Sequence, residues 1–292
     1  MKDHMIRVLT EDGSLRACAA VTTGLVRDIC DLQQTDPLAS VALGRLVTGT
    51  ALLGSLLKGR QRLALSVEGN GPLRALHAET DAFGHLCGSI KVPDSGLAVD
   101  GGILSVADAV GRAGFLHVIK DLGLKEPYQG MVQLQTSEIA EDLAYYLTTS
   151  EQVPSSVALG VYLETDGSVA AAGGFLVQAM PACPEENLQQ IESTLSALPP
   201  VSELIRQGQG PEGLLQRIFA GIPFSAREET PLVMQCRCNR ERVLQMLRGL
   251  SVDELSRLIE QEEETTVTCE FCKQSYVFSR NDLVKLRSSD TD

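Results

Sequence analysis

Four cysteines near the C-terminus are the residues whose type and spacing could do chemistry. Cys236 and Cys238 are separated by one residue in QCRCN, and Cys269 and Cys272 by two residues in TCEFCK. Zn²⁺ prefers four tetrahedral ligands and binds thiolates at about 2.3 Å, so each close pair can supply one edge of a tetrahedron. Residues 239–268 would fold back to bring the two edges together. The spacing therefore predicts one metal site with four sulfur ligands.

The expected ligand set contains cysteine alone, because the histidines of this chain lie far away in the sequence, at positions 4, 77, 85 and 117. Four filled positions leave no open coordination site, which argues against hydrolytic metal catalysis. Spacing alone leaves several functions open: a passive structural clip, a zinc ribbon that binds nucleic acid, a thiol oxidoreductase, or a redox switch.

Two features favour the switch. A disulfide between Cys236 and Cys238 would close a small, distorted ring, and strained disulfides are the labile, regulatory kind. The segment that carries the thiols, residues 230–292, is also small enough to be marginally stable without help. Zinc can supply ~10–16 kcal/mol of apparent folding free energy at such sites. Oxidation of a ligand pair would then release the metal and unfold the segment in one event.

A nucleic-acid ribbon would need basic and stacking side chains on this segment. Candidates are present: Arg237, Arg240, Arg242, Lys273, Arg280, Tyr276 and Phe278. However, the segment between the thiol pairs reads SVDELSRLIEQEEE, and the formal net charge of the chain is −13, which repels a polyanion. Tyr276 and Phe278 alternate with Val277 as in a strand and are expected in the core of the small unit. The basic residues are expected to offset the charge of the thiolates.

Other candidate groups have simpler explanations. Cys18, Cys30, Cys87 and Cys183 are scattered along the chain, and single cysteines in apolar surroundings are mostly inert. Glu138, Glu141 and Asp142 could be catalytic carboxylates, but they fall in the first turn of a helix expected to begin after an N-cap at Ser137. There they would compensate the helix dipole.

The first 181 residues must form the scaffold. Strand pairs are expected around the Asp12-Gly13 turn, between residues 62 and 90, from 115 to 136, and around Asp166-Gly167. Helices are expected near residues 22–34 and from Ser137 onward. The longest apolar run, Pro37 to Leu57, could span a bilayer by length, but Arg45 interrupts it, so a buried core helix is expected. These signals predict an α+β fold.

Residues 182–229 carry short amphipathic helices, with Leu188, Ile191, Leu195 and Leu198 on one face of the first. Because such helices are too short to persist alone in water, they are expected to form a linker docked on a neighbour. The expected organisation is a core domain at 1–181, a helical linker at 182–229 and a zinc-binding switch domain at 230–292. The N-terminus lacks the apolar segment of a signal peptide, so a soluble, cytoplasmic protein is expected.

The CRC and CEFC motifs, thirty residues apart, resemble the C-terminal signature of the 33 kDa heat-shock chaperone family, the bacterial redox-regulated holdases. The strings VEGNGPL, VIKDLGLKEPYQG, SEIAEDLAYYLTTSEQVPSSVALGV and AAGGFLVQAMP resemble the N-terminal domain of that family in the same order. The resemblance covers essentially the whole chain and departs at none of the four thiol positions.

The resemblance implies an ATP-independent chaperone rather than an enzyme. When reduced, it would hold one Zn²⁺ through Cys236, Cys238, Cys269 and Cys272 and be inactive. Oxidants together with unfolding stress would release zinc and form the disulfides Cys236–Cys238 and Cys269–Cys272. The switch domain and linker would unfold, and the protein would hold unfolded clients, often as a homodimer. No nucleic acid, membrane or nucleotide partner is expected.

Overall fold

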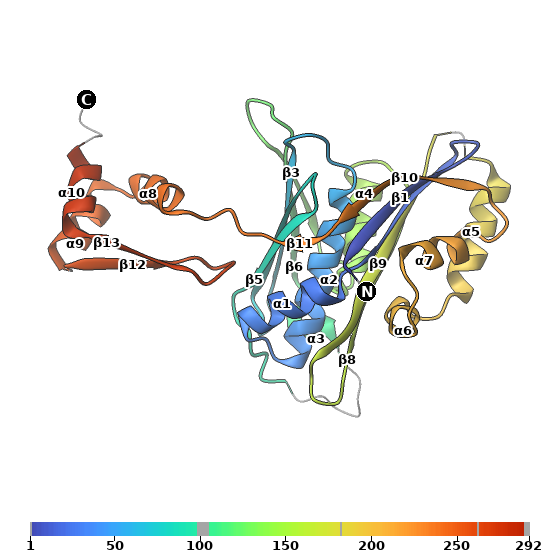
Figure 1. Ribbon diagram of the computed structural model, residues 1–292, viewed down its shortest axis with the longest axis horizontal. Helices are drawn as coiled ribbons and strands as arrows, with labels where there is room; N and C mark the ends of the chain where they lie inside the picture. Colours follow the sequence, from blue (N-terminus) through green and yellow to red (C-terminus); the bar gives the residue numbers. More distant parts are fainter. Residues whose placement is uncertain (1, 98–104, 182, 262, 289–292) are drawn as a thin grey trace. The chain divides into compact units, whose positions relative to one another are not determined.

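The computed structural model describes residues 2–97, 105–181, 183–261 and 263–288. Contacts within the chain divide it into two compact units, Met1–Gln235 and Cys236–Asp292 (Figure 1). The first unit combines two antiparallel-rich sheets with helices, and the second places helices beside a two-stranded sheet. The predicted α+β fold is therefore confirmed.

The first sheet is antiparallel and has the strand order β10-β1-β2-β9-β8. Its strands are β1 (His4–Thr10), β2 (Leu15–Val21), β8 (Ser155–Leu163), β9 (Val169–Ala179) and β10 (Phe224–Pro231). The turn between β1 and β2 lies at the expected Asp12-Gly13, where Gly13 adopts a φ of 71° and its N–H donates to Thr10 O at 2.9 Å. Both strands of this hairpin then pair onward, β1 with β10 and β2 with β9.

The second sheet has the order β11-β5-β4-β3-β6-β7, and its one parallel pair joins β11 to β5. Its strands are β3 (Arg62–Gly69), β4 (Ala75–Asp81), β5 (His85–Ile90), β6 (Gly114–Asp121), β7 (Tyr128–Gln133) and β11 (Val233–Met234). The predicted strand pairs between residues 62 and 90 and between 115 and 136 are confirmed.

The apolar run that begins at Pro37 forms α2 (Pro37–Gly54), which lies between the two sheets (Figure 1). Asp36 caps this helix, because its carboxylate accepts a hydrogen bond from Ala39 N at 2.6 Å. Within the described part of the chain it is long and apolar enough to cross a membrane, but 89% of that stretch is buried inside the fold. It is therefore a core helix, as predicted, packed with α1 (Thr23–Gln33) and α3 (Val106–Val110).

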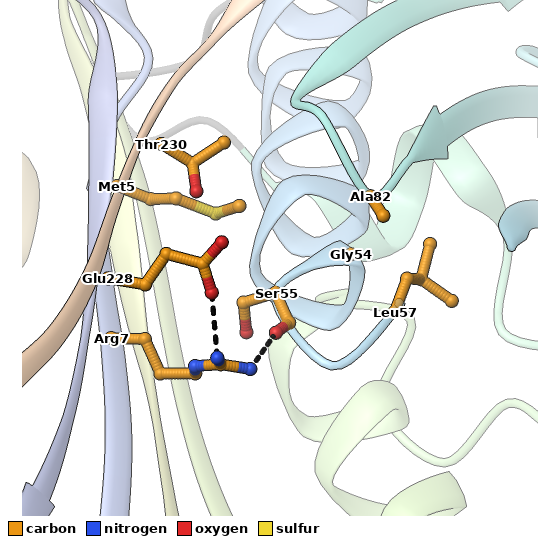
Figure 2. A pocket seen from close by; sticks show the side chains of 8 residues that line it. All are labelled: Met5, Arg7, Gly54, Ser55, Leu57, Ala82, Glu228 and Thr230. Atoms are coloured by element: carbon orange, nitrogen blue, oxygen red, sulfur yellow. Dashed lines mark hydrogen bonds and ion pairs between the residues drawn. The ribbon is translucent and has the colours of Figure 1, made fainter. Parts of the chain in front are cut away.

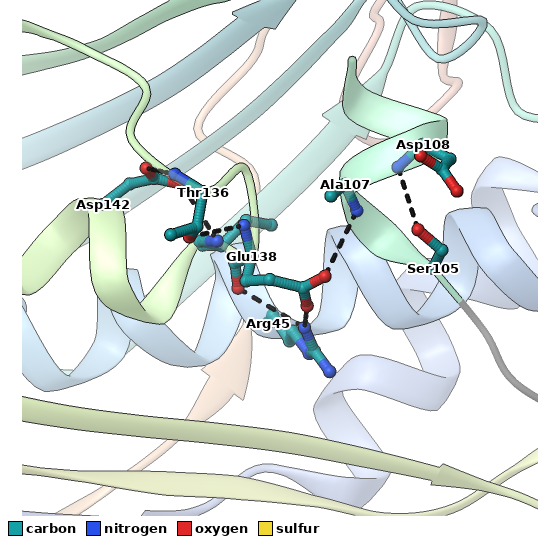
Figure 3. Close-up of polar contacts among 8 residues, drawn as sticks. Arg45, Ser105, Ala107, Asp108, Thr136, Glu138 and Asp142 are labelled. Atoms are coloured by element: carbon teal, nitrogen blue, oxygen red, sulfur yellow. Dashed lines mark hydrogen bonds and ion pairs between the residues drawn. The ribbon is translucent and has the colours of Figure 1, made fainter. Parts of the chain in front are cut away.

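The helix expected to follow an N-cap at Ser137 begins later, as α4 (Ala140–Thr149). Ser137 and Ile139 have left-handed backbone angles, with φ of 63° and 69°, and the buried Ser137 hydroxyl donates to Gly111 O at 2.7 Å. The prediction of Ser137 as N-cap is therefore wrong. Glu138 precedes the helix, where its carboxylate pairs with Arg45 of α2 and accepts from Ala107 N (Figure 3).

Asp142 caps α4 from inside the helix. Its buried carboxylate accepts hydrogen bonds from the backbone N–H groups of Gln135 at 2.6 Å, Thr136 at 3.1 Å and Ile139 at 3.2 Å. These contacts close the irregular segment 135–139 onto the first turn of the helix. Asp142 therefore has a structural role, as does Glu138 through its ion pair with Arg45.

Replacement of Asp142 by alanine should leave these three donors without partners in a buried place. Because each unsatisfied buried group costs about 1–3 kcal/mol, we expect Asp142→Ala to destabilise the first unit by about 3 kcal/mol and to lower its melting temperature by roughly 10 °C. The measurement is calorimetric unfolding. Glu141→Ala is the matched control, because Glu141 is exposed in the same turn and its loss should cost under about 1 kcal/mol. Equal melting temperatures for both variants would refute this role.

The segment predicted as a helical linker forms α5 (Glu185–Ala197), α6 (Val201–Arg206) and α7 (Pro211–Ile218). These helices pack on the face of the first sheet opposite α2, in a second apolar core. Its linker members include Ile191, Leu204, Ile205, Leu214, Leu215 and Ile218, and its sheet members include Val8, Ala19, Ala171, Phe175 and Val177. The chain then enters β10, so residues 224–229 of the expected linker belong to the first sheet.

Strands β10 and β11 lead the chain from the linker to the second unit, and several contacts anchor them. The guanidinium of Arg7 donates to the Glu228 carboxylate at 2.7 Å and to Ser55 O, at the end of α2, at 2.8 Å (Figure 2). Leu232 N donates to Asp3 O at 3.0 Å, and Gln235 N donates to Leu86 O at 2.8 Å. The residue directly before Cys236 is thus hydrogen-bonded to the core of the first unit.

The second unit contains α8 (Arg240–Arg248), α9 (Val252–Gln261), β12 (Glu264–Thr268), β13 (Ser275–Ser279) and α10 (Arg280–Ser288). Its apolar core gathers Val243, Leu247, Leu255, Ile259, Phe278, Leu283 and Leu286. Phe278 is fully buried, and Tyr276 packs against this cluster, as predicted from their alternation with Val277.

Candidate functional site

The first thiol pair lies in the extended segment between β11 and α8. Asn239 follows Cys238 directly and caps α8, because its side-chain oxygen accepts from Arg242 N at 2.8 Å. The guanidinium of Arg242 turns back and donates to Arg237 O at 3.1 Å. The capped start of α8 therefore fixes the end of the CRC segment that leads into the second unit.

The second thiol pair lies in the turn that joins β12 to β13. Cys269 N donates to Gln274 O, and Lys273 N donates to Cys269 O, each at 2.9 Å. Lys273 has a left-handed φ of 57°, which lets the chain reverse within this short loop. The hairpin thereby places the sulfurs of Cys269 and Cys272 on one side of a tight loop.

The structure brings the four predicted cysteines together. Their Sγ atoms all lie within 4.8 Å of one another; Cys236 and Cys269 are 3.7 Å apart, and Cys238 and Cys272 are 3.1 Å apart. Four thiolates around one Zn²⁺ at about 2.3 Å would be separated by about 3.8 Å along each edge of the tetrahedron. All four are free, partly buried thiols. Their number, type and spacing fit a metal site.

Three of the sulfurs have shifted proton affinities. Burial, together with hydrogen bonding to Cys269, raises the pKa of the Cys236 thiol well above its usual range. Burial also acts to raise the pKa of Cys238, but hydrogen bonds from Tyr276 and Cys272 outweigh it and lower that pKa. Burial and the bond to Cys238 raise the pKa of Cys272. Because thiolates bind metals and thiols do not, a bound cation would take the place of the thiol protons of the cluster.

Sequence reasoning placed Tyr276 in the core of the small unit but missed its contact with the thiol cluster. Its hydroxyl lies 3.2 Å from Cys238 Sγ, and this hydrogen bond, with burial, raises the pKa of the phenol to about 12. The strand pattern correctly placed the ring beside the core but did not show where the hydroxyl points. The available signal was that this core position, close in sequence to the second thiol pair, carries a tyrosine, whose hydroxyl needs a partner, rather than a phenylalanine.

Two of the basic residues considered for nucleic-acid or thiolate contact bind protein groups instead. The guanidinium of Arg240 donates to Val277 O at 2.6 Å and to Asp282 at 2.9 Å, and it stacks over the ring of Phe278 at 4.4 Å. The Arg242 guanidinium binds the backbone, as described above. These two side chains therefore hold the small unit together.

The remaining cysteines lie apart from the cluster. Cys18, Cys30 and Cys87 are buried in the first unit, whereas Cys183 is partly exposed at the start of the linker helices. Burial raises the pKa of Cys18 to about 12 and also raises the pKa of Cys30. Because the thiolate is the reactive form, these two thiols are poor nucleophiles.

Comparisons with known proteins agree with one another. The family model described as Hsp33 protein matches residues 3–279. The 33 kDa chaperonin of Syntrophotalea carbinolica is 61% identical over 286 residues, which cover 98% of this chain and 99% of that protein. The 33 kDa chaperonin of Geobacter sulfurreducens is 52% identical over 99% of this chain and 96% of its own length. The crystal structure of a 33 kDa chaperonin (heat shock protein 33 homolog) from Thermotoga maritima is similar over the full length of both chains, with a TM-score of 0.90 and 33% identity.

Proposed function

The chain belongs to the Hsp33 protein family, and from that premise we propose how it works as a redox-regulated chaperone. It binds unfolded client proteins and is not an enzyme. The proposal concerns the switch: the metal that holds it, the thiols that trigger it, and the apolar surface that it releases. The observation that carries it is the gathering of four sulfurs within 4.8 Å in a small unit that follows directly on the linker and its two anchoring strands.

In the reduced, inactive state, Cys236, Cys238, Cys269 and Cys272 would hold one Zn²⁺ through their sulfurs. The all-thiolate donor set suits zinc, and a bound ion would supply folding free energy of ~10–16 kcal/mol to the second unit. The protein contributes the two pre-formed loops, one ending at the cap of α8 and one between β12 and β13. These loops hold the sulfurs together and partly exclude water.

Activation would oxidise the four thiols to two disulfides. For each pair, one molecule of peroxide accepts two electrons; two thiols lose their protons, one S–S bond forms, and two molecules of water leave. We assign the disulfides to Cys236–Cys238 and Cys269–Cys272. In the folded cluster the short sulfur contacts join one pair to the other. Once the unit opens, however, the two segments diffuse apart, and sulfurs near in sequence keep the higher effective concentration.

Loss of the metal would unfold the second unit and remove the folded neighbour that follows β11. The linker helices would then leave the first sheet. Their apolar side chains, and those of the sheet beneath them, are buried in the second core of the first unit. Released together, they would offer a mobile apolar surface that adapts to many unfolded clients without ATP. The same exposed surface would favour a homodimer of the active form. An inactive state with reduced thiols fits a protein of the reducing cytoplasm.

The test is to treat reduced, zinc-loaded protein with peroxide at elevated temperature while recording three signals. Zinc release, disulfide pairing by peptide mapping, and light scattering of a denaturing client should change together, with near-complete suppression of scattering by the oxidised protein. The reduced protein at the same temperature is the control. Complete zinc release without suppression of client aggregation would overturn the proposal.

A further inference from the structure

We propose that Tyr276 is a positioning residue of the thiol switch: its hydroxyl donates a hydrogen bond to Cys238 Sγ and slows oxidant attack at that sulfur. This inference rests on the proposed function for its meaning. Its geometry, however, belongs to the cluster itself, where the hydroxyl and the sulfur are 3.2 Å apart.

The ring of Tyr276 is held so that the hydroxyl has a fixed direction. Tyr276 lies on β13 opposite Val267 of β12, two residues from the fully buried Phe278, and therefore on the same face of the strand. Val267 and the Tyr276 ring both pack against the core of the second unit. Because the body of the side chain is set by packing, the hydroxyl is a pre-oriented donor that needs little reorganisation to bind sulfur.

The direction of donation follows from the charge on sulfur. As a metal ligand Cys238 would be a thiolate, which has no hydrogen, so the phenol must be the donor. A hydrogen bond to an anion is shorter and stronger than one between neutral groups, and it withdraws charge from the acceptor. A sulfur with less available charge attacks peroxide more slowly. The hydroxyl therefore protects Cys238 without being consumed.

The other sulfurs have different partners. Cys236 accepts from the backbone N–H of Cys238, and Cys272 from that of Gln274; contacts between sulfurs join Cys236 to Cys269 and Cys238 to Cys272. Tyr276 thus contributes a side-chain donor directed at one sulfur of the four. A single substitution can remove it without altering the backbone of either loop.

The reaction that the hydroxyl modulates is the first step of oxidation. The thiolate of Cys238 attacks one oxygen of peroxide, the O–O bond breaks, and hydroxide leaves and is protonated to water. The sulfenic acid so formed is then attacked by a neighbouring thiol, which forms the S–S bond and releases a second water. Tyr276 affects the first attack alone, because the charged sulfur that it stabilises exists before that step and not after it.

Tyr276→Phe is the test, because it keeps the ring and removes the hydroxyl. The full-length, reduced, zinc-loaded protein is exposed briefly to limiting peroxide at fixed pH without a client, and each cysteine is then quantified by peptide mass spectrometry. We expect the oxidation rate of Cys238 to rise roughly tenfold, the equivalent of one charge-assisted hydrogen bond. The neighbouring thiol that resolves its sulfenic acid should be consumed at the same increased rate, while the other two thiols change little. Ser275→Ala is the matched control: it deletes a hydroxyl from the same strand, one that bonds Thr268 Oγ1 at 2.9 Å and touches no sulfur.

Zinc content and amide exchange of α8–α10 report whether Tyr276→Phe remains folded. If it does not, 3,5-difluorotyrosine at position 276 tests the inference in the opposite direction. It keeps the size of the ring, is a stronger donor while protonated, and should slow oxidation of Cys238. An unchanged rate at Cys238 in a folded variant, or an equal rise at all four thiols, would overturn the inference. Neither outcome depends on client binding, so failure here is distinct from failure of the proposed function.

Discussion

Chelation of the metal under reducing conditions is expected to unfold the second unit while the core of the first unit around α2 stays folded. The apolar core of the second unit is a small cluster around Phe278, and its helices α8, α9 and α10 are short. A domain is typically stable by only 5–15 kcal/mol, and a structural zinc contributes ~10–16 kcal/mol. The folding free energy lost with the ion should therefore be larger than the packing of the second unit can offset. Loss of amide-exchange protection in residues 240–288, with protection retained in α2, is the measurement.

Cys269→Ser should reproduce this effect without a chelator, because a serine hydroxyl is a poor substitute for a thiolate on zinc. We expect the variant to hold less than one zinc per chain, to lose protection throughout the second unit, and to be partly active while reduced. Cys183→Ser is the matched control, since Cys183 is a partly exposed thiol outside the cluster. A Cys269→Ser protein that stays zinc-loaded and fully protected would show that packing, and not the ion, holds the unit together.

The parts of the fold that sequence could predict are those that local chemistry determines. Four thiols in two close pairs indicate a metal site from their spacing in the sequence alone. The run from Pro37 is apolar on every side, so it could only be a core helix or a membrane span, and Arg45 decided between them. The Asp12-Gly13 turn requires a left-handed residue that glycine supplies.

The parts that sequence could not predict depend on partners distant in the chain. Strand β10 pairs with β1 and is fastened by Arg7 to Glu228, a contact across 221 residues, so its segment was assigned to linker and switch domain. Serine is a residue type that favours the N-cap, but the Ser137 hydroxyl donates to Gly111 O instead. Similarly, the carboxylate of Glu138 forms an ion pair with Arg45. The hydroxyl of Tyr276 likewise meets Cys238 across 38 residues. Tertiary contacts decided each of these positions.

The docking of the linker on the first sheet leaves no room for a side chain at Gly160. Gly160 of β8 lies directly under the start of α6. A Cβ atom built on Gly160 would lie 2.8 Å from the Cβ and N atoms of Ser202 and 2.8 Å from Val201 Cγ1. Contacts this short to backbone atoms cannot persist, so either the strand or the helix must move. The strand is paired along its length with β9, whereas α6 is a single short helix, so we expect the helix to move.

Gly160→Val is therefore expected to displace α6 and let the reduced, zinc-loaded protein hold clients without oxidation. Valine suits a strand, so the sheet should survive, while overpacking should weaken linker docking by about 1–3 kcal/mol or more. The measurements are amide exchange of α5–α7 and suppression of client aggregation under reducing conditions, with zinc content unchanged. Ser156→Val is the matched control, since Ser156 is exposed on the same face of β8. A variant whose linker loosens while client binding stays absent would separate linker release from chaperone activity and contradict the mechanism. A linker that stays protected would show instead that the sheet yields first.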